Sequence, residues 1–82
     1  MQSSDLNEGI SIIKRVSSKL PKKSGVYKMI SINNEILYIG KAKDLSKRVK
    51  SYSNPMRLNY RLQTMVSLVR SVDFIITKNE AY

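Results

Sequence analysis

Apolar residues at the start of this chain follow the spacing of a helix that buries one face. They stand three or four positions apart: Leu6, Ile10, Ile13 and Val16. This spacing predicts a helix, and Ser4-Asp5 can cap its start. Pro21 is expected to end it, because the residue before a proline is pushed out of the α region. Residues 1–19 are therefore predicted to form a leading helix.

Three later segments are rich in strand-forming residues, namely Gly25–Ile30, Glu35–Ile39 and Val72–Thr77. Asparagine tolerates a positive φ, so Asn33-Asn34 is predicted to join the first two segments as a β-hairpin with a two-residue turn. Such a turn pairs residues whose numbers sum to 67. Tyr27 and Tyr38 then become diagonal neighbours on one face of the sheet.

Two further helices are predicted between the hairpin and the last strand. Asp44 can cap a short helix that runs to about Tyr52, with its apolar stripe formed by Leu45, Val49 and Tyr52. Asn54-Pro55 interrupts the chain, and a longer helix is predicted over Arg57–Arg70, with a buried side formed by Leu58, Leu62, Met65, Val66 and Val69. The order of elements predicts one α+β domain over residues 1–82, with a small, three-stranded, largely antiparallel sheet flanked by helices.

The charge of the chain indicates a polyanionic partner. The chain has 15 Lys and Arg against 6 Asp and Glu, and its net charge is +9. Fourteen of the basic residues lie between Lys14 and Arg70, a stretch with two acids, Glu35 and Asp44. This balance favours a nucleic acid, which binds cations by releasing counterions from its phosphates. On charge alone, simple solubility, a ribosome contact or a membrane-surface contact stays open.

Some functions are excluded by composition. The sequence has no His and no Cys, which removes imidazole and thiolate zinc sites and any Ser-His or Cys-His catalysis. No apolar run approaches the ~20 residues that cross a bilayer, and no signal-peptide pattern opens the chain. A cytoplasmic protein without membrane association is the expectation.

Two short motifs on the predicted hairpin carry a family resemblance. Gly25-Val26-Tyr27 lies on one strand and Tyr38-Ile39-Gly40 on the next, followed by Gly40–Leu45 (GKAKDL) and by Lys47-Arg48-Val49. In this combination, the chain resembles the UvrC branch of the GIY-YIG nuclease family over about residues 20–81. The resemblance implies the GIY-YIG fold and a DNA endonuclease for nucleotide excision repair. It would cut a phosphodiester 3′ to a lesion, with DNA as substrate and the UvrB subunit as partner.

The resemblance also implies roles for particular residues. Tyr38 or Tyr27 would be the general base, with Tyr38 favoured, because nearby cations can lower a tyrosine pKa from its usual value of about 10. Arg48 would stabilise the transition state, since a guanidinium can clamp a phosphate with two hydrogen bonds. The other assignments are Lys41 as a catalytic cation, Tyr52 as a supporting hydroxyl, Lys43, Lys47 and Lys50 as DNA contacts, and Gly25 and Gly40 as points of close backbone approach. Without the resemblance, ordinary strand tyrosines, a surface arginine and a solvated lysine flank would explain the same residues.

The metal site is where the chain departs from the family pattern. The family holds one divalent ion, Mg²⁺ or Mn²⁺, with a Glu on the helix after the third strand. Asn79-Glu80-Ala81 resembles the opening of that helix, and the ligand is expected about two turns later, beyond Tyr82. Glu80, Glu35 and Asp73 do not match its position. We therefore expect a truncated domain that binds no metal tightly and is inactive alone; a non-catalytic, basic DNA-binding module is the alternative.

Overall fold

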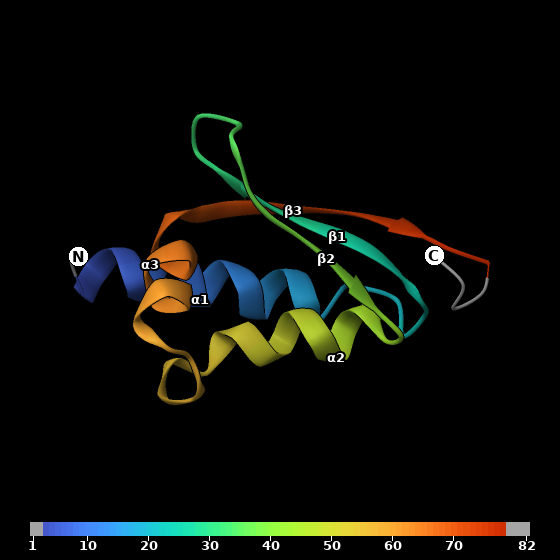
Figure 1. The fold of residues 1–82 in the computed structure, drawn as a ribbon. Coiled ribbons are helices and arrows are strands. Elements are labelled where there is room, and N and C mark those ends of the chain that lie inside the picture. The colour runs from blue at the N-terminus through green and yellow to red at the C-terminus, as the bar shows by residue number, and fades with distance from the viewer. Residues whose placement is uncertain (1–2, 79–82) are drawn as a thin grey trace.

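Three strands form an antiparallel sheet in the order β2-β1-β3, and three helices pack against one side of it in the part of the chain that the structure describes (Figure 1). The structure is a computed structural model and describes residues 3–78. Its elements are α1 (Ser3–Ser17), β1 (Gly25–Ser31), β2 (Ile36–Ala42), α2 (Leu45–Lys50), α3 (Tyr60–Leu68) and β3 (Val69–Ile76), with short 3-10 turns at Ser51–Ser53 and Pro55–Arg57. The predicted α+β fold is confirmed. The predicted cap at Asn79 lies outside the described residues.

The core lies between the sheet and the helices. The fully buried side chains come from five of these elements and are Ile13, Tyr27, Met29, Leu45, Val49, Val66 and Val69. The apolar stripes predicted for the first two helices point into this core, and Leu6, Ile10 and Val16 pack around its edge. No helix within residues 3–78 is long and apolar enough to cross a membrane.

The β1–β2 hairpin has the predicted register but not the predicted turn. Tyr27 pairs with Gly40 and Met29 pairs with Tyr38, as a sum of 67 requires. The loop nevertheless has three residues, closed by a hydrogen bond from the Ser31 amide to the Glu35 carbonyl, with Asn34 at a φ of 64°. A bulge then makes Ile30 pair with Ile36 and leaves Leu37 as the extra residue. The three-residue loop lowers the pairing sum by one and the bulge raises it again by one. Tyr27 and Tyr38 therefore keep the predicted register.

The predicted bounds of the third helix and third strand were wrong. α3 begins at Tyr60 rather than at Arg57, because Pro55–Arg57 forms a separate 3-10 turn. The Asn59 side chain accepts a hydrogen bond from the Leu62 amide, which caps α3 at a later point. The helix ends at Leu68 rather than at Arg70, and the third strand begins at Val69 rather than at Val72. The reason is that Val69 already pairs with Ser31 in the sheet.

α1 lies unusually close to α3. A Cβ atom added to Gly9 would be 1.9 Å from the carbonyl oxygen of Val66, which is far inside van der Waals contact. Arg70, at the start of β3, also lies 3.8 Å from Asp5 and 3.5 Å from Glu8 on the first turns of α1. The two acids near the beginning of α1 are thus engaged at this end of the molecule.

Candidate active site

Three tyrosine rings gather on the face of the sheet that the helices cover. Tyr27 comes from β1, Tyr38 from β2 and Tyr52 from the 3-10 turn after α2. Every pair of ring centroids is 6.1 Å apart, and the hydroxyl oxygens of Tyr27 and Tyr52 lie 2.8 Å apart in a buried hydrogen bond. Tyr27 and Tyr52 are buried, whereas Tyr38 is 39% exposed. Tyr38 is therefore the member of the cluster that a substrate in solution can reach.

Two glycines allow this cluster to form. A Cβ on Gly40 would lie 2.4 Å from the Tyr27 hydroxyl oxygen and 2.5 Å from its Cζ, so the ring occupies the space that a side chain would need. A Cβ on Gly25 would lie 2.4 Å from the carbonyl oxygen of Ile75 on β3. At both positions, another part of the chain fills the space that a side chain would need.

The two buried phenols are held in their neutral form. Burial raises the pKa of Tyr27, while its hydrogen bond with Tyr52 and the positive charge of Arg48 act in the opposite direction. Burial also raises the pKa of Tyr52, and its hydrogen bond with Tyr27 raises that pKa further. A base must be able to lose its proton, so these two tyrosines are suited to donating or sharing hydrogen bonds instead.

We expect the raised pKa values to make the domain lose stability in alkali. Their folded-state values lie above the ordinary tyrosine value of ~10, so the folded chain keeps protons that the unfolded chain releases. Their contribution is complete below pH ~10 and falls as the pH rises above it. Urea unfolding between about pH 8 and pH 11.5 measures this effect. As the pH rises, the free energy of unfolding should fall less for Tyr52→Phe than for the unchanged chain. Tyr60→Phe, at an exposed tyrosine, should follow the unchanged chain; equal pH slopes for all three would contradict this account.

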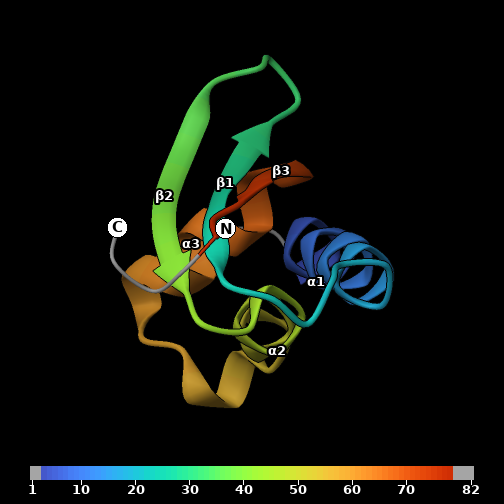
Figure 2. The same ribbon diagram turned by 90° about the vertical axis from the view of Figure 1, so that its right-hand side faces the viewer.

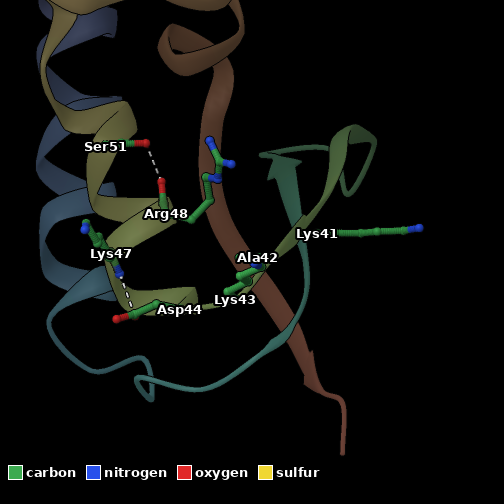
Figure 3. A pocket seen from close by; sticks show the side chains of 7 residues that line it. All are labelled: Lys41, Ala42, Lys43, Asp44, Lys47, Arg48 and Ser51. Atoms are coloured by element: carbon green, nitrogen blue, oxygen red, sulfur yellow. Dashed lines mark hydrogen bonds between the residues drawn. The ribbon is translucent and has the colours of Figure 1, made fainter. Parts of the chain in front are cut away.

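The basic residues predicted for the site lie on different sides of it. A hollow of about 510 Å³ opens between the end of β2 and α2, and is lined by Lys41, Ala42, Lys43, Asp44, Lys47, Arg48 and Ser51 (Figure 3). Arg48 is close enough to influence the pKa of Tyr27. Lys41 pairs with Val26 and therefore belongs to the opposite face of the sheet from Tyr38, and its side chain extends away from α2 (Figure 3). Lys50 is exposed near the end of α2 and does not line this hollow.

Carboxylates do not gather near the tyrosines within residues 3–78. Asp44 lines the hollow, but its side chain accepts a hydrogen bond of 3.0 Å from the Lys47 amide and caps α2. The other described acids are elsewhere: Asp5 and Glu8 beside Arg70, Glu35 after the hairpin loop, and Asp73 on the outer face of the sheet. The described part of the chain has no group of three residues of the metal-binding types His, Cys, Asp or Glu. These residues do not fit a site for Mg²⁺, which favours carboxylate oxygens. Glu80 lies outside the described residues.

A hairpin that carries two tyrosines as diagonal neighbours on one face, followed by a short helix with an arginine, defines a nuclease domain of the GIY-YIG class. Residues 23–82 match the family model of the UvrC-like GIY-YIG domain, so the chain belongs to that family. Domains of this family are metal-dependent endonucleases.

Individual relatives agree with this family. The chain is 43% identical over 77 residues to the UvrABC system protein C of Sphingopyxis alaskensis, and 40% identical over 75 residues to that of Paramagnetospirillum magneticum. The two matches cover 94% and 92% of this chain, and it spans only 12% of the length of each relative. The solved GIY-YIG N-terminal endonuclease domain of UvrC from Thermotoga maritima, bound to magnesium, is similar with a TM-score of 0.72 and 28% identity. That match covers 98% of this chain and 78% of the solved one.

Proposed function

We propose that this chain provides the base and the cation of an endonuclease that cuts DNA 3′ to a lesion during nucleotide excision repair. The observation that carries the proposal is the position of Tyr38, the exposed member of a cluster whose other two tyrosines are buried. In the complete protein, duplex DNA would be the substrate and the UvrB subunit the partner, as the likeness to UvrABC system protein C suggests.

The three tyrosines, Arg48 and three lysines each have a defined part in this proposal. Tyr38 takes a proton from the attacking water, because its ring is accessible and the buried phenols are not. Arg48 places its guanidinium against the negative charge that develops on the phosphate. Tyr27 and Tyr52 share a hydrogen bond that holds both rings beside the base. Lys43, beside the hollow, and Lys47 and Lys50, on α2, would contact the DNA backbone.

The metal requires a separate proposal. The matched domain from Thermotoga maritima binds magnesium, whereas residues 3–78 of this chain do not supply the carboxylates that such an ion needs. We therefore assign the ligand for Mg²⁺ or Mn²⁺ to sequence outside these residues, and derive no step through the ion. The second candidate function is a basic module that binds DNA without cutting it.

Plasmid nicking tests the proposal and separates it from the second candidate. The 82-residue chain should not nick DNA with Mg²⁺ or Mn²⁺. A chimera that joins this chain at Thr77 to the segment that follows the third strand in the Thermotoga maritima domain should nick it, and a chelator should stop the reaction. Chelator-sensitive nicking by the 82-residue chain would show that our metal assignment is wrong. A folded chimera that binds DNA and never nicks it would favour the binding module.

We also expect the chain to bind duplex DNA with little sequence preference and with a steep dependence on salt. The fourteen-to-two excess of basic residues between Lys14 and Arg70 provides the attraction. Each phosphate that is neutralised should contribute about −0.9 to the slope of log K against log salt concentration. Fluorescence anisotropy with unrelated duplexes between about 50 and 200 mM salt measures this slope. An affinity that does not change over this range would rule out an electrostatic interface.

A further inference from the structure

A second basic surface lies beside α2, apart from the tyrosine cluster. We call it the basic loop surface, and it consists of Lys19, Lys22 and Lys23, between α1 and β1, together with Lys47 on α2. All four residues are exposed, and the sequence has no acidic residue between Glu8 and Glu35. The catalytic assignment uses none of the three loop lysines, so their position needs an explanation of its own.

The loop is held against α2 by hydrogen bonds. The Leu45 amide donates to the Lys23 carbonyl at 3.0 Å, and the Ser46 amide donates to the Pro21 carbonyl at 3.3 Å. The Ser46 hydroxyl also donates to the Ser17 carbonyl at the end of α1, at 2.9 Å. These bonds fix the lysine-bearing backbone before any ligand arrives, which lowers the entropic cost of binding.

The arrangement of the elements shows how this surface relates to the catalytic side. Figure 2 shows the loop passing from the end of α1 to β1 next to the beginning of α2. In Figure 3, Lys47 points away from the side of α2 on which Arg48 lies. Consecutive residues on a helix point about 100° apart, so α2 presents Arg48 to the tyrosines and Lys47 to another side.

We propose that the basic loop surface binds the phosphate backbone of duplex DNA on the side of α2 away from Tyr38. This inference rests on the proposed function, and it adds a region of the footprint that lies outside the cleavage site. Lysine suits this role, since its ammonium group is a compact charge that contacts phosphates without reading bases.

An anionic membrane is the competing surface of the same charge, and the fold argues against it. Membrane-surface helices present an apolar face to the acyl chains. In α1, Ile13 is fully buried, while Leu6, Ile10 and Val16 pack against the core. The apolar side of the helix next to the lysines is thus already used inside the protein, which favours DNA.

A pair of charge-matched variants tests the proposal. Lys22→Ala/Lys23→Ala removes two charges from the basic loop surface, and Lys28→Ala/Arg61→Ala removes two from β1 and α3. If each loop lysine neutralises one phosphate, the first variant should reduce the magnitude of the salt slope by about 1.8, and the second should leave it nearly unchanged. Circular dichroism and thermal unfolding should match the unchanged chain for both variants.

Equal changes of slope in both variants would mean that only net charge matters, and would overturn the inference while leaving DNA binding intact. Failure of the unchanged chain to bind duplex DNA would instead overturn the proposed function, and this inference with it.

Site-specific cross-linking gives a second readout. The sequence has no cysteine, so Lys22→Cys provides a unique position for a photo-activated cross-linker. This probe should cross-link to duplex DNA, whereas the same probe at Glu35→Cys, after the hairpin loop, should not. Equal cross-linking from both positions would overturn the assignment. Retention of the Lys22-labelled chain on phosphatidylserine vesicles, without cross-linking to DNA, would assign the surface to a membrane instead.

Discussion

Replacing Gly9 with alanine should lower the free energy of unfolding by about 3 kcal/mol, the upper part of the range for overpacked interiors. The added Cβ would lie 1.9 Å from the Val66 carbonyl oxygen, and a backbone atom cannot rotate away as a side chain can. α1 would have to move away from α3, which would loosen the contacts of Ile13 with the core. Urea unfolding followed by circular dichroism measures the loss.

The sign of this effect distinguishes packing from helix propensity. Alanine is better than glycine inside a helix by about 1 kcal/mol, so propensity alone predicts a more stable Gly9→Ala variant. Ser11→Ala, at an exposed position of the same helix, is the matched control and should change stability by less than about 0.5 kcal/mol. A Gly9→Ala variant as stable as the unchanged chain would show that the two helices can separate without cost.

Arg48→Ala in the nuclease chimera should reduce the rate of nicking by about 100-fold or more, the typical result of removing one donor that stabilises developing charge. Arg48 is exposed, so its loss should leave the fold and thermal unfolding unchanged. Arg48→Lys keeps the charge but loses the planar guanidinium, so its nicking rate should lie between that of the unchanged chimera and that of Arg48→Ala. The comparison uses single-turnover nicking at saturating protein, so that weaker DNA binding does not imitate slower chemistry.

The matched control for this effect is Arg61→Ala, which removes an exposed arginine from α3. It should leave the single-turnover rate within about twofold, because an exposed substitution outside the site removes no donor near the phosphate. If Arg48→Ala were no slower than Arg61→Ala, Arg48 could not stabilise the transition state.

Local patterns predicted most of the fold because they report burial directly. Helical spacing identified the side of α1 that carries Ile13, and an apolar stripe identified Val49 in α2. The hairpin loop and the start of α3 were mispredicted, since both depend on choices among neighbouring asparagines. Asn34 adopts a positive φ in a three-residue loop, and Asn59 rather than the residues near Pro55 caps the helix.

The candidate site was predictable where the hairpin register determines it. The pairing sum brings Tyr27 and Tyr38 together, and the same sum could have shown that Lys41 opposes Val26 on the other face. The hydrogen bond between Tyr27 and Tyr52 depends on the 3-10 turn after α2, which residue spacing does not reveal. Gly9 gave no recognisable signal, because a glycine inside a helix usually indicates weak propensity rather than a close contact.

The pairing of Met29 with Tyr38 limits how this hairpin can vary in evolution or in design. Directly paired residues of an antiparallel hairpin share a face, so this pairing keeps Tyr38 on the side of Tyr27. Residues added to the tip, beyond the hydrogen bond from the Ser31 amide to the Glu35 carbonyl, would lengthen the loop and leave the pairing unchanged. A single residue inserted between Ile39 and Gly40, with Gly40 still paired to Tyr27 and no new bulge, would turn Tyr38 to the outer face and bring Ile39 into the cluster. Relatives can therefore differ freely in the length of the tip, but not in the spacing within β2.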